Sequence, residues 1–247
     1  MKTTSTLRVA AGTIGAGAAL AVLGYAAFAG TAWTRYGHAA RTRRKEEDDP
    51  VLDGFMPLYD VVERHSIRVS APADVTFGVA RDLDLSDSFL VQAIFRGREL
   101  MLGGTPAPRG VAEPPGLVAT ALRLGWGVLA DRAGREIVLG AVTKPWEPNP
   151  AFQDLRAQEF ASFLEPGLVK IAFTLRVDPL PDGTSVFRTE TRALATDVDA
   201  RAKFRRYWAL VSPGVALIRQ AMLEPVRREA ERRAALVAAE RQEMAAI

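Results

Sequence analysis

The feature that most constrains the fold is a long helical pattern near the carboxyl end, at residues 196–233. Apolar residues recur there at steps of three and four, which is the spacing of one face of an α-helix. Thr196 or Asp197 is placed to cap the first turn. Pro213 should kink the helix at residues 212–214 without ending it, because the apolar spacing continues in phase. The stripe needs a large apolar surface to cover, and it consists of Phe204, Trp208, Val211, Val215, Ile218, Met222 and Val226.

The residues before this helix supply such a surface, because several segments have the alternation or the turn signals of strands. The expected strands are residues 61–69, 122–130, 135–143, 168–177 and 184–195. The expected helices are residues 73–81 and 86–102, with a helical or turn-like stretch at 154–164. Residues 103–116, rich in glycine and proline, should form a loop, either a tolerated insertion or a mobile lid. Strands followed by one long helix predict an α+β fold, with that helix laid across a curved antiparallel sheet.

The amino-terminal residues 9–34 carry no charge and are numerous enough to cross a bilayer as a helix. One interpretation is a cleaved signal peptide, with small residues at 27 and 29 as the cleavage site. The other, which we favour, is an uncleaved transmembrane anchor, because the run is longer than the usual apolar core of a signal. The basic residues after it would leave the following domain in the cytoplasm of a single-pass membrane protein. They are Arg35, Arg41, Arg43, Arg44 and Lys45.

Composition excludes several classes of site. The chain of 247 residues has no cysteine, so disulfides, thiolate metal ligands and cysteine nucleophiles are excluded. His38 and His65 are the two histidines, which argues against a metal site built from histidine. The net charge of +3 lies largely beside the apolar run and on the last helix, which favours an anionic membrane surface over nucleic acid as a partner. No nucleophile elbow, phosphate loop or dinucleotide fingerprint occurs, so we expect no cofactor and assign no catalytic residue.

An ordered set of short motifs carries a resemblance to a known family. The strand-to-helix join at residues 67–77 (IRVSAPADVTF) resembles the opening of domains of the START-like superfamily. In this chain, Phe77 stands where the superfamily usually has a tryptophan. This superfamily is also called SRPBCC, or the polyketide cyclase/dehydrase and lipid-transport group. Later motifs look like one bacterial branch of it, at residues 134–140, 146, 165–167, 204–208, 213–214 and 217–219. The resemblance covers residues 61–233 and implies a helix-grip fold, which hosts carriers, receptors and enzymes alike.

The chain is therefore expected to have four parts. Residues 1–36 form the anchor or signal segment, and residues 37–60 form a charged juxtamembrane linker. Residues 61–233 form the START-like domain, and residues 234–247 form a helical tail.

The helix-grip fold implies a cavity between sheet and long helix that holds an apolar ligand. The helix would direct Phe204, Trp208, Val211 and Val215 toward it, and Trp126, Phe173 and Leu175 would line the other wall. His65 shares a strand face with Ile67 and Val69, and Tyr207 lies at the edge of the helical stripe. These two are the polar residues that could reach a ligand. Any of the apolar residues could equally be ordinary core.

Three functions remain open. The favoured one is a membrane-anchored domain that binds an apolar or lipid-like small molecule without chemistry. The second is an enzyme of cyclase, dehydratase or isomerase type, which needs His65 or a carboxylate such as Glu190 to face the cavity. Glu190 with Arg188 and Arg192 would otherwise form a charged ladder on the outer sheet face. The third is an assembly module that pairs with a protein partner through residues 224–247.

Overall fold

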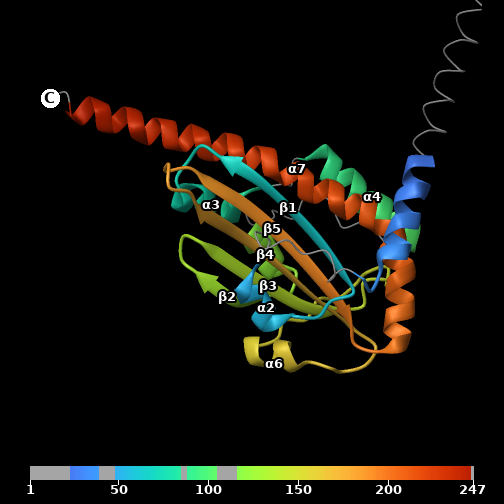
Figure 1. The fold of residues 1–247 in the computed structure, drawn as a ribbon. Helices are drawn as coiled ribbons and strands as arrows, with labels where there is room; N and C mark the ends of the chain where they lie inside the picture. Colours follow the sequence, from blue (N-terminus) through green and yellow to red (C-terminus); the bar gives the residue numbers. More distant parts are fainter. Residues whose placement is uncertain (1–22, 39–47, 85–87, 105–115, 246–247) are drawn as a thin grey trace, which may run out of the picture.

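The computed structural model describes residues 23–38, 48–84, 88–104 and 116–245. It is an α+β fold with a five-stranded antiparallel sheet in the order β1-β5-β4-β3-β2 (Figure 1). The strands are β1 (Val61–Val69), β2 (Gly127–Arg132), β3 (Glu136–Thr143), β4 (Val169–Pro179) and β5 (Ser185–Ala195). The helices are α2 (Pro50–Phe55), α3 (Ala73–Asp82), α4 (Phe89–Leu102), α5 (Leu117–Arg123), α6 (Ala157–Ser162) and α7 (Val198–Ala245). The expected α+β class is confirmed. The antiparallel sheet and the long C-terminal helix match the helix-grip arrangement.

One expected strand is wrong in its first half. Residues 122–130 were predicted as a strand, whereas α5 ends at Arg123 and β2 begins only at Gly127. The alternation of Leu122, Leu124 and Trp126 imitates a strand, but Leu122 and Leu124 are exposed in the structure. Residues 105–115 of the expected loop lie outside the described residues.

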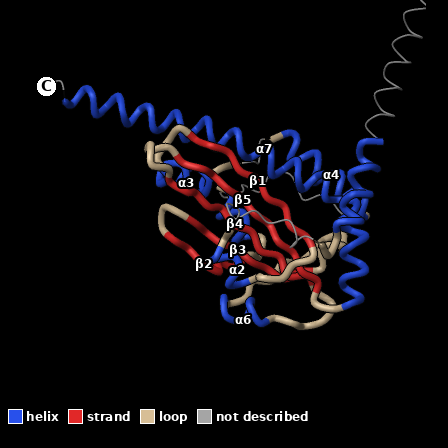
Figure 2. Tube along the Cα trace, viewed as in Figure 1, coloured by secondary structure: helices blue, strands red, loops and turns tan. Residues whose placement is uncertain are grey.

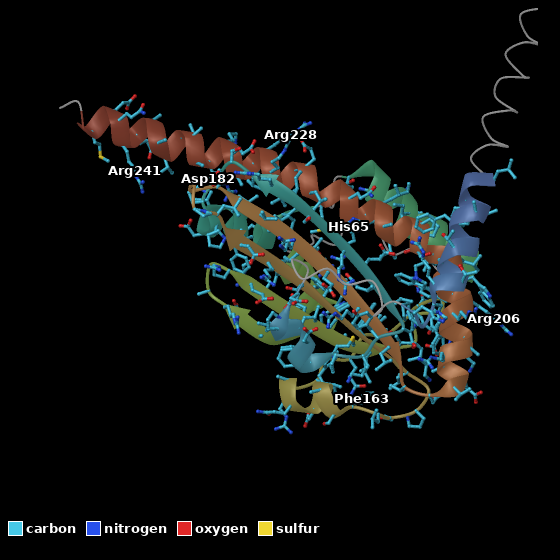
Figure 3. The ribbon with its side chains drawn as sticks, in the orientation of Figure 1. His65, Phe163, Asp182, Arg206, Arg228 and Arg241 are labelled. Atoms are coloured by element: carbon cyan, nitrogen blue, oxygen red, sulfur yellow. The ribbon has the colours of Figure 1, made fainter. Side chains whose placement is uncertain are left out.

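Helix α7 is the longest element, at 48 residues. Asp197 caps it, because its Oδ1 accepts a hydrogen bond from the Ala200 amide at 2.8 Å. The helix continues beyond residue 233, so the described part of the expected tail belongs to the same helix. It also changes direction (Figure 3), with Arg206 on one limb and Arg228 on the other. The expected kink at residues 212–214 lies in this interval, where Pro213 removes a backbone donor.

Both faces of the sheet are covered (Figure 2). Helices α7, α3 and α5 pack on one face, which we call the α7 face, and α2 and α6 pack on the other. Leu52 and Met56 are fully buried in the second layer, and Tyr59 is nearly so. The predicted linker at residues 37–60 therefore needs correction. Its residues 50–60 belong to the folded domain, because their apolar side chains cover the sheet, while residues 39–47 lie outside the described part.

The helical residues 23–35 lie against the first limb of α7. Arg205 Nη2 donates to the Trp33 carbonyl at 3.0 Å, and its guanidinium lies 4.1 Å from the centre of the Trp33 ring. Tyr36 packs edge-on against Phe204, with ring centroids 5.9 Å apart. Within the described ranges, no helix combines the length and apolarity needed to cross a bilayer. Residues 9–22 of the expected span lie outside these ranges.

Candidate functional site

The α7 face carries two apolar clusters with polar residues between them. One cluster contains Tyr36, Val61, Val169, Ala193, Phe204 and Trp208. The other contains Val69, Phe77, Ile137, Leu139, Phe173, Leu175, Val177, Phe187, Met222 and Val226, with further small residues. The residues between them are Glu63 and His65 on β1 and Thr189 and Thr191 on β5, which we call the polar band.

The strand register brings the polar band together. In the antiparallel pair β1–β5, Glu63 lies opposite Thr191 and His65 lies opposite Thr189. In β4, Phe173 lies opposite Thr191, and Leu175 lies opposite Thr189. Because side chains alternate along a strand, all of these project from the same face. The predicted orientation of His65 toward α7 follows from this register, and Figure 3 labels this residue beside β1.

Two polar atoms of the band are buried without a hydrogen-bond partner among the described residues, His65 Nε2 and Thr191 Oγ1. The carboxylate oxygen Glu63 Oε2 lies 3.6 Å from His65 Nε2, beyond hydrogen-bond distance. An unsatisfied buried polar group costs about 1–3 kcal/mol. Atoms of this kind take their partner from water or from a bound molecule.

Helix α7 adds a cation to this region. Arg219 Nη1 donates to Thr189 Oγ1 at 3.3 Å, and its guanidinium lies 4.9 Å from the centre of the Phe173 ring. Burial lowers the pKa of Arg219 to about 10, although the charge of Glu63 acts in the opposite direction. Arg219 is not among the site residues predicted from the sequence. It lies four residues after Val215 and three before Met222, which is the spacing of the apolar stripe. This spacing is the signal that could have placed Arg219 on the inner face of the helix.

An aromatic group borders the band. Trp126 meets Phe173 edge-on at 5.0 Å between centroids and stacks on Phe152 at 5.3 Å. Gly125 permits this arrangement, because its φ is +95° and a Cβ there would lie 2.3 Å from the Phe152 carbonyl oxygen. Of the predicted wall residues, Phe173 thus lies beside Arg219, Trp126 packs against Phe173, and Leu175 is buried in the same cluster.

The predicted residues of α7 lie at the other end of the face. Phe204 and Trp208 are buried in the first cluster, with Tyr207 and Val215 partly buried against it. The Tyr207 hydroxyl accepts a hydrogen bond from Arg98 Nε on α4 at 3.1 Å, which ties the two helices together. Val211 is partly buried. The structure therefore divides the predicted site between two clusters, with His65 between them, and their binding of a ligand stays a prediction.

Glu190 and Arg192 do not face α7. They lie on the opposite sheet face, where Arg192 is fully buried and its Nε donates to Glu190 Oε1 at 2.6 Å. Glu190 Oε2 also lies 2.9 Å from Arg64 Nε. The charged ladder lies on the sheet face where it was expected, but this face is not the outer surface of the domain, because α2 covers it. Arg188 pairs with Asp178 at 2.8 Å. The carboxylate on the α7 face is Glu63 instead of Glu190.

Other candidate sites are limited. Among the described residues, no three histidine, aspartate or glutamate side chains come close enough to hold a metal ion.

A surface pocket of about 340 Å³ lies at the start of α7, away from the polar band. It is lined by Tyr36, Gly37, Val198, Arg201, Ala202 and Arg205. Arg201 in this pocket already pairs with the buried Asp60, so much of its charge is neutralised.

Comparisons with known proteins add nothing to the description of the fold. No family model matches the chain, and no curated protein matches it. Among solved structures, protein CV1439 from Chromobacterium violaceum is similar at 12% identity, over 66% of this chain and 97% of that one, with a TM-score of 0.24. The Zhui aromatase/cyclase from Streptomyces sp. R1128 is similar at 14% identity, over 70% of this chain and 94% of that one, with a TM-score of 0.21. Similarity at these TM-scores carries no argument about function.

Proposed function

We propose that this domain binds an apolar small molecule between the sheet and α7, without chemistry, and that residues 9–34 anchor it in a membrane. The observation that carries the proposal is the pair of unpartnered buried atoms, His65 Nε2 and Thr191 Oγ1, between two apolar clusters of the same sheet face. Ligand sites commonly combine an apolar lining with a few polar groups that fix orientation. Trp126 and Phe173 supply the lining, and the polar band supplies the orienting groups.

The membrane part of the proposal rests on the amino-terminal residues. Residues 9–34 are uncharged, and a basic cluster follows them. Leu23, Tyr25, Phe28 and Trp33 are exposed, although the same helical segment contacts α7. An anchor there would hold the domain at the bilayer surface, where apolar molecules are concentrated.

The test is to purify the full chain in a mild detergent, extract it with organic solvent and analyse the extract by mass spectrometry. We expect a retained apolar compound at about one molecule per chain. Thr191→Val, which keeps the side-chain shape but removes the hydroxyl, should reduce retention, and Phe173→Ala should abolish it. Leu164→Ala, at a side chain that is 75% exposed, is the matched control and should retain the compound. A chain that carries nothing and takes up nothing from lipid vesicles would exclude the binding function.

A second candidate function is proton-transfer catalysis of the cyclase or dehydratase type. The observation that favours it is the 3.6 Å approach of Glu63 Oε2 to His65 Nε2 in a partly buried position. Histidine is the side chain that most often serves as a general acid and base, and a neighbouring carboxylate can orient its ring. Incubation of the extracted compound with fresh protein decides between the two. Conversion that stops in His65→Gln while binding persists supports the enzyme, and absence of conversion supports binding alone.

A further inference from the structure

We infer that the bound molecule is an apolar carboxylic acid, and that Arg219 recognises its carboxylate against the ring of Phe173. The inference rests on the proposed function, because it names the chemical class of the ligand for the same face of the sheet. It is carried by the position of Arg219 beside the unpartnered atoms of the polar band.

Arg219 differs from the other inward-facing arginines of the domain. Arg64 and Arg192 share Glu190, at 2.9 and 2.6 Å. Among the described residues, no carboxylate lies within 4.0 Å of the Arg219 guanidinium, and its one hydrogen bond is the contact of 3.3 Å with Thr189. Taking a charge out of water without a partner costs several kcal/mol, so a partly buried arginine of this kind is a site for an anion. Within the described part of the chain, the guanidinium therefore has no ion pair in direct contact, and Glu63 acts on it only from beyond 4.0 Å.

The geometry favours a planar anion. Phe173 lies against the guanidinium at 4.9 Å and so limits the directions in which the fork can turn. One N–H of the fork is used by Thr189, and a guanidinium has five. The remaining donors suit a carboxylate, which accepts two parallel hydrogen bonds from arginine. Thr191 Oγ1, on the next position of the same strand face, can donate to the carboxylate as well.

The charges around the site favour one negative charge over two. Glu63 is the acidic group of the polar band, and it lies nearest to His65 at 3.6 Å. It would repel a dianion such as a phosphate monoester, and Arg219 supplies one compensating positive charge. Trp126 and Phe152 extend the apolar surface beside Phe173. A single carboxylate on an apolar body therefore fits this combination of groups.

The test is a competition between acids and matching alcohols. The full chain in phosphatidylcholine nanodiscs is incubated with equal amounts of palmitic acid and hexadecanol. A parallel sample receives anthracene-2-carboxylic acid and anthracene-2-methanol. The chain is then isolated through a tag, and the retained compounds are quantified against empty nanodiscs. We expect the acid of at least one pair to be retained about tenfold over its alcohol, the effect of one charge-assisted interaction.

Variants assign the effect to Arg219. Arg219→Gln should remove the preference for the acid and leave retention of the alcohol unchanged. Arg219→Lys keeps the charge but not the fork, and should give an intermediate preference. Arg228→Gln, on the exposed side of α7, is the control and should behave as the parent (Figure 3). Circular dichroism of each variant verifies folding.

The outcomes separate the inference from the proposed function. Equal retention of acid and alcohol overturns the inference and leaves apolar binding standing. A preference for the acid that survives Arg219→Gln overturns the role of Arg219. Retention of none of the four compounds counts against both.

Discussion

Arg192 Nη1 donates a hydrogen bond of 2.7 Å to Asp53 Oδ1, and this contact joins β5 to helix α2. The same nitrogen donates to the Met56 carbonyl at 2.7 Å, and the guanidinium lies 4.7 Å from the centre of the Tyr59 ring. Arg192 is fully buried. It therefore fastens residues 50–60 to the face of the sheet that does not contact α7.

Arg192→Ala should lower the free energy of unfolding by about 3–5 kcal/mol, because it removes a positively charged partner of the buried Glu190 carboxylate. Urea unfolding followed by circular dichroism measures this. Arg68→Ala is the control, because Arg68 pairs with Asp182 on the surface and its side chain is 63% exposed. Loss of that pair should change stability by about 1 kcal/mol or less. Equal effects of the two substitutions would contradict a stabilising role for the buried arginine.

Glu136 predicts how stability depends on pH. Burial first, and then the charge and hydrogen bond of Asp49, raise its pKa from 4.5 to about 7. The folded chain then binds a proton more tightly than the unfolded chain does. This contribution is fully present below pH 4.5 and is lost as the pH rises to about 7. Urea unfolding across this range should show a decline that Glu136→Gln flattens, and the same slope in the variant would refute the assignment.

Two glycines in helices should respond to alanine in opposite directions. A Cβ added at Gly78 in α3 would have no atom within 4 Å, so Gly78→Ala should stabilise the fold by about 0.5–1 kcal/mol. At Gly214 in α7 a Cβ would lie 2.8 Å from Ile94 Cγ2 of α4, so Gly214→Ala should destabilise it instead. Thermal unfolding measures both. Adding Ile94→Ala should relieve part of the second effect, and stabilisation by Gly214→Ala alone would disprove the close approach of α4 and α7.

The contact between Arg205 and Trp33 predicts a local effect. Arg205→Ala removes both the hydrogen bond to the Trp33 carbonyl and the ring contact, at a cost of about 1 kcal/mol. Amides of residues 32–37 should exchange their hydrogens several-fold faster, while those of the sheet keep their rates. Arg206→Ala is the control, because this side chain is exposed on the same limb of α7 (Figure 3). Unchanged exchange in Arg205→Ala would show that other contacts hold the segment.

Local patterns in the sequence were sufficient for most of the elements, but not for the short helices α2 and α5. The three- and four-residue spacing from Phe204 to Val226 predicted the long helix, and Asp197 was recognised as one possible cap. Alternation predicted β1 and β4 to within a few residues, and the turns beside them predicted β3 and β5. These predictions succeeded because backbone geometry repeats over a few residues, so neighbours in the chain carry the signal. The same reasoning failed at residues 122–126, where alternating apolar residues belong to the end of a helix and the loop after it.

Only the tertiary structure decided which side chains share a site. His65 meets Thr189, and Glu63 meets Thr191, through strand pairing across more than 100 residues of chain. Arg219 reaches Phe173 because α7 crosses the sheet at that level, and Glu190 is removed from the site because α2 covers its face. Burial and electrostatic partners depend on which elements pack together. That choice is made by the summed packing of the whole domain, so no local pattern could have placed these charges.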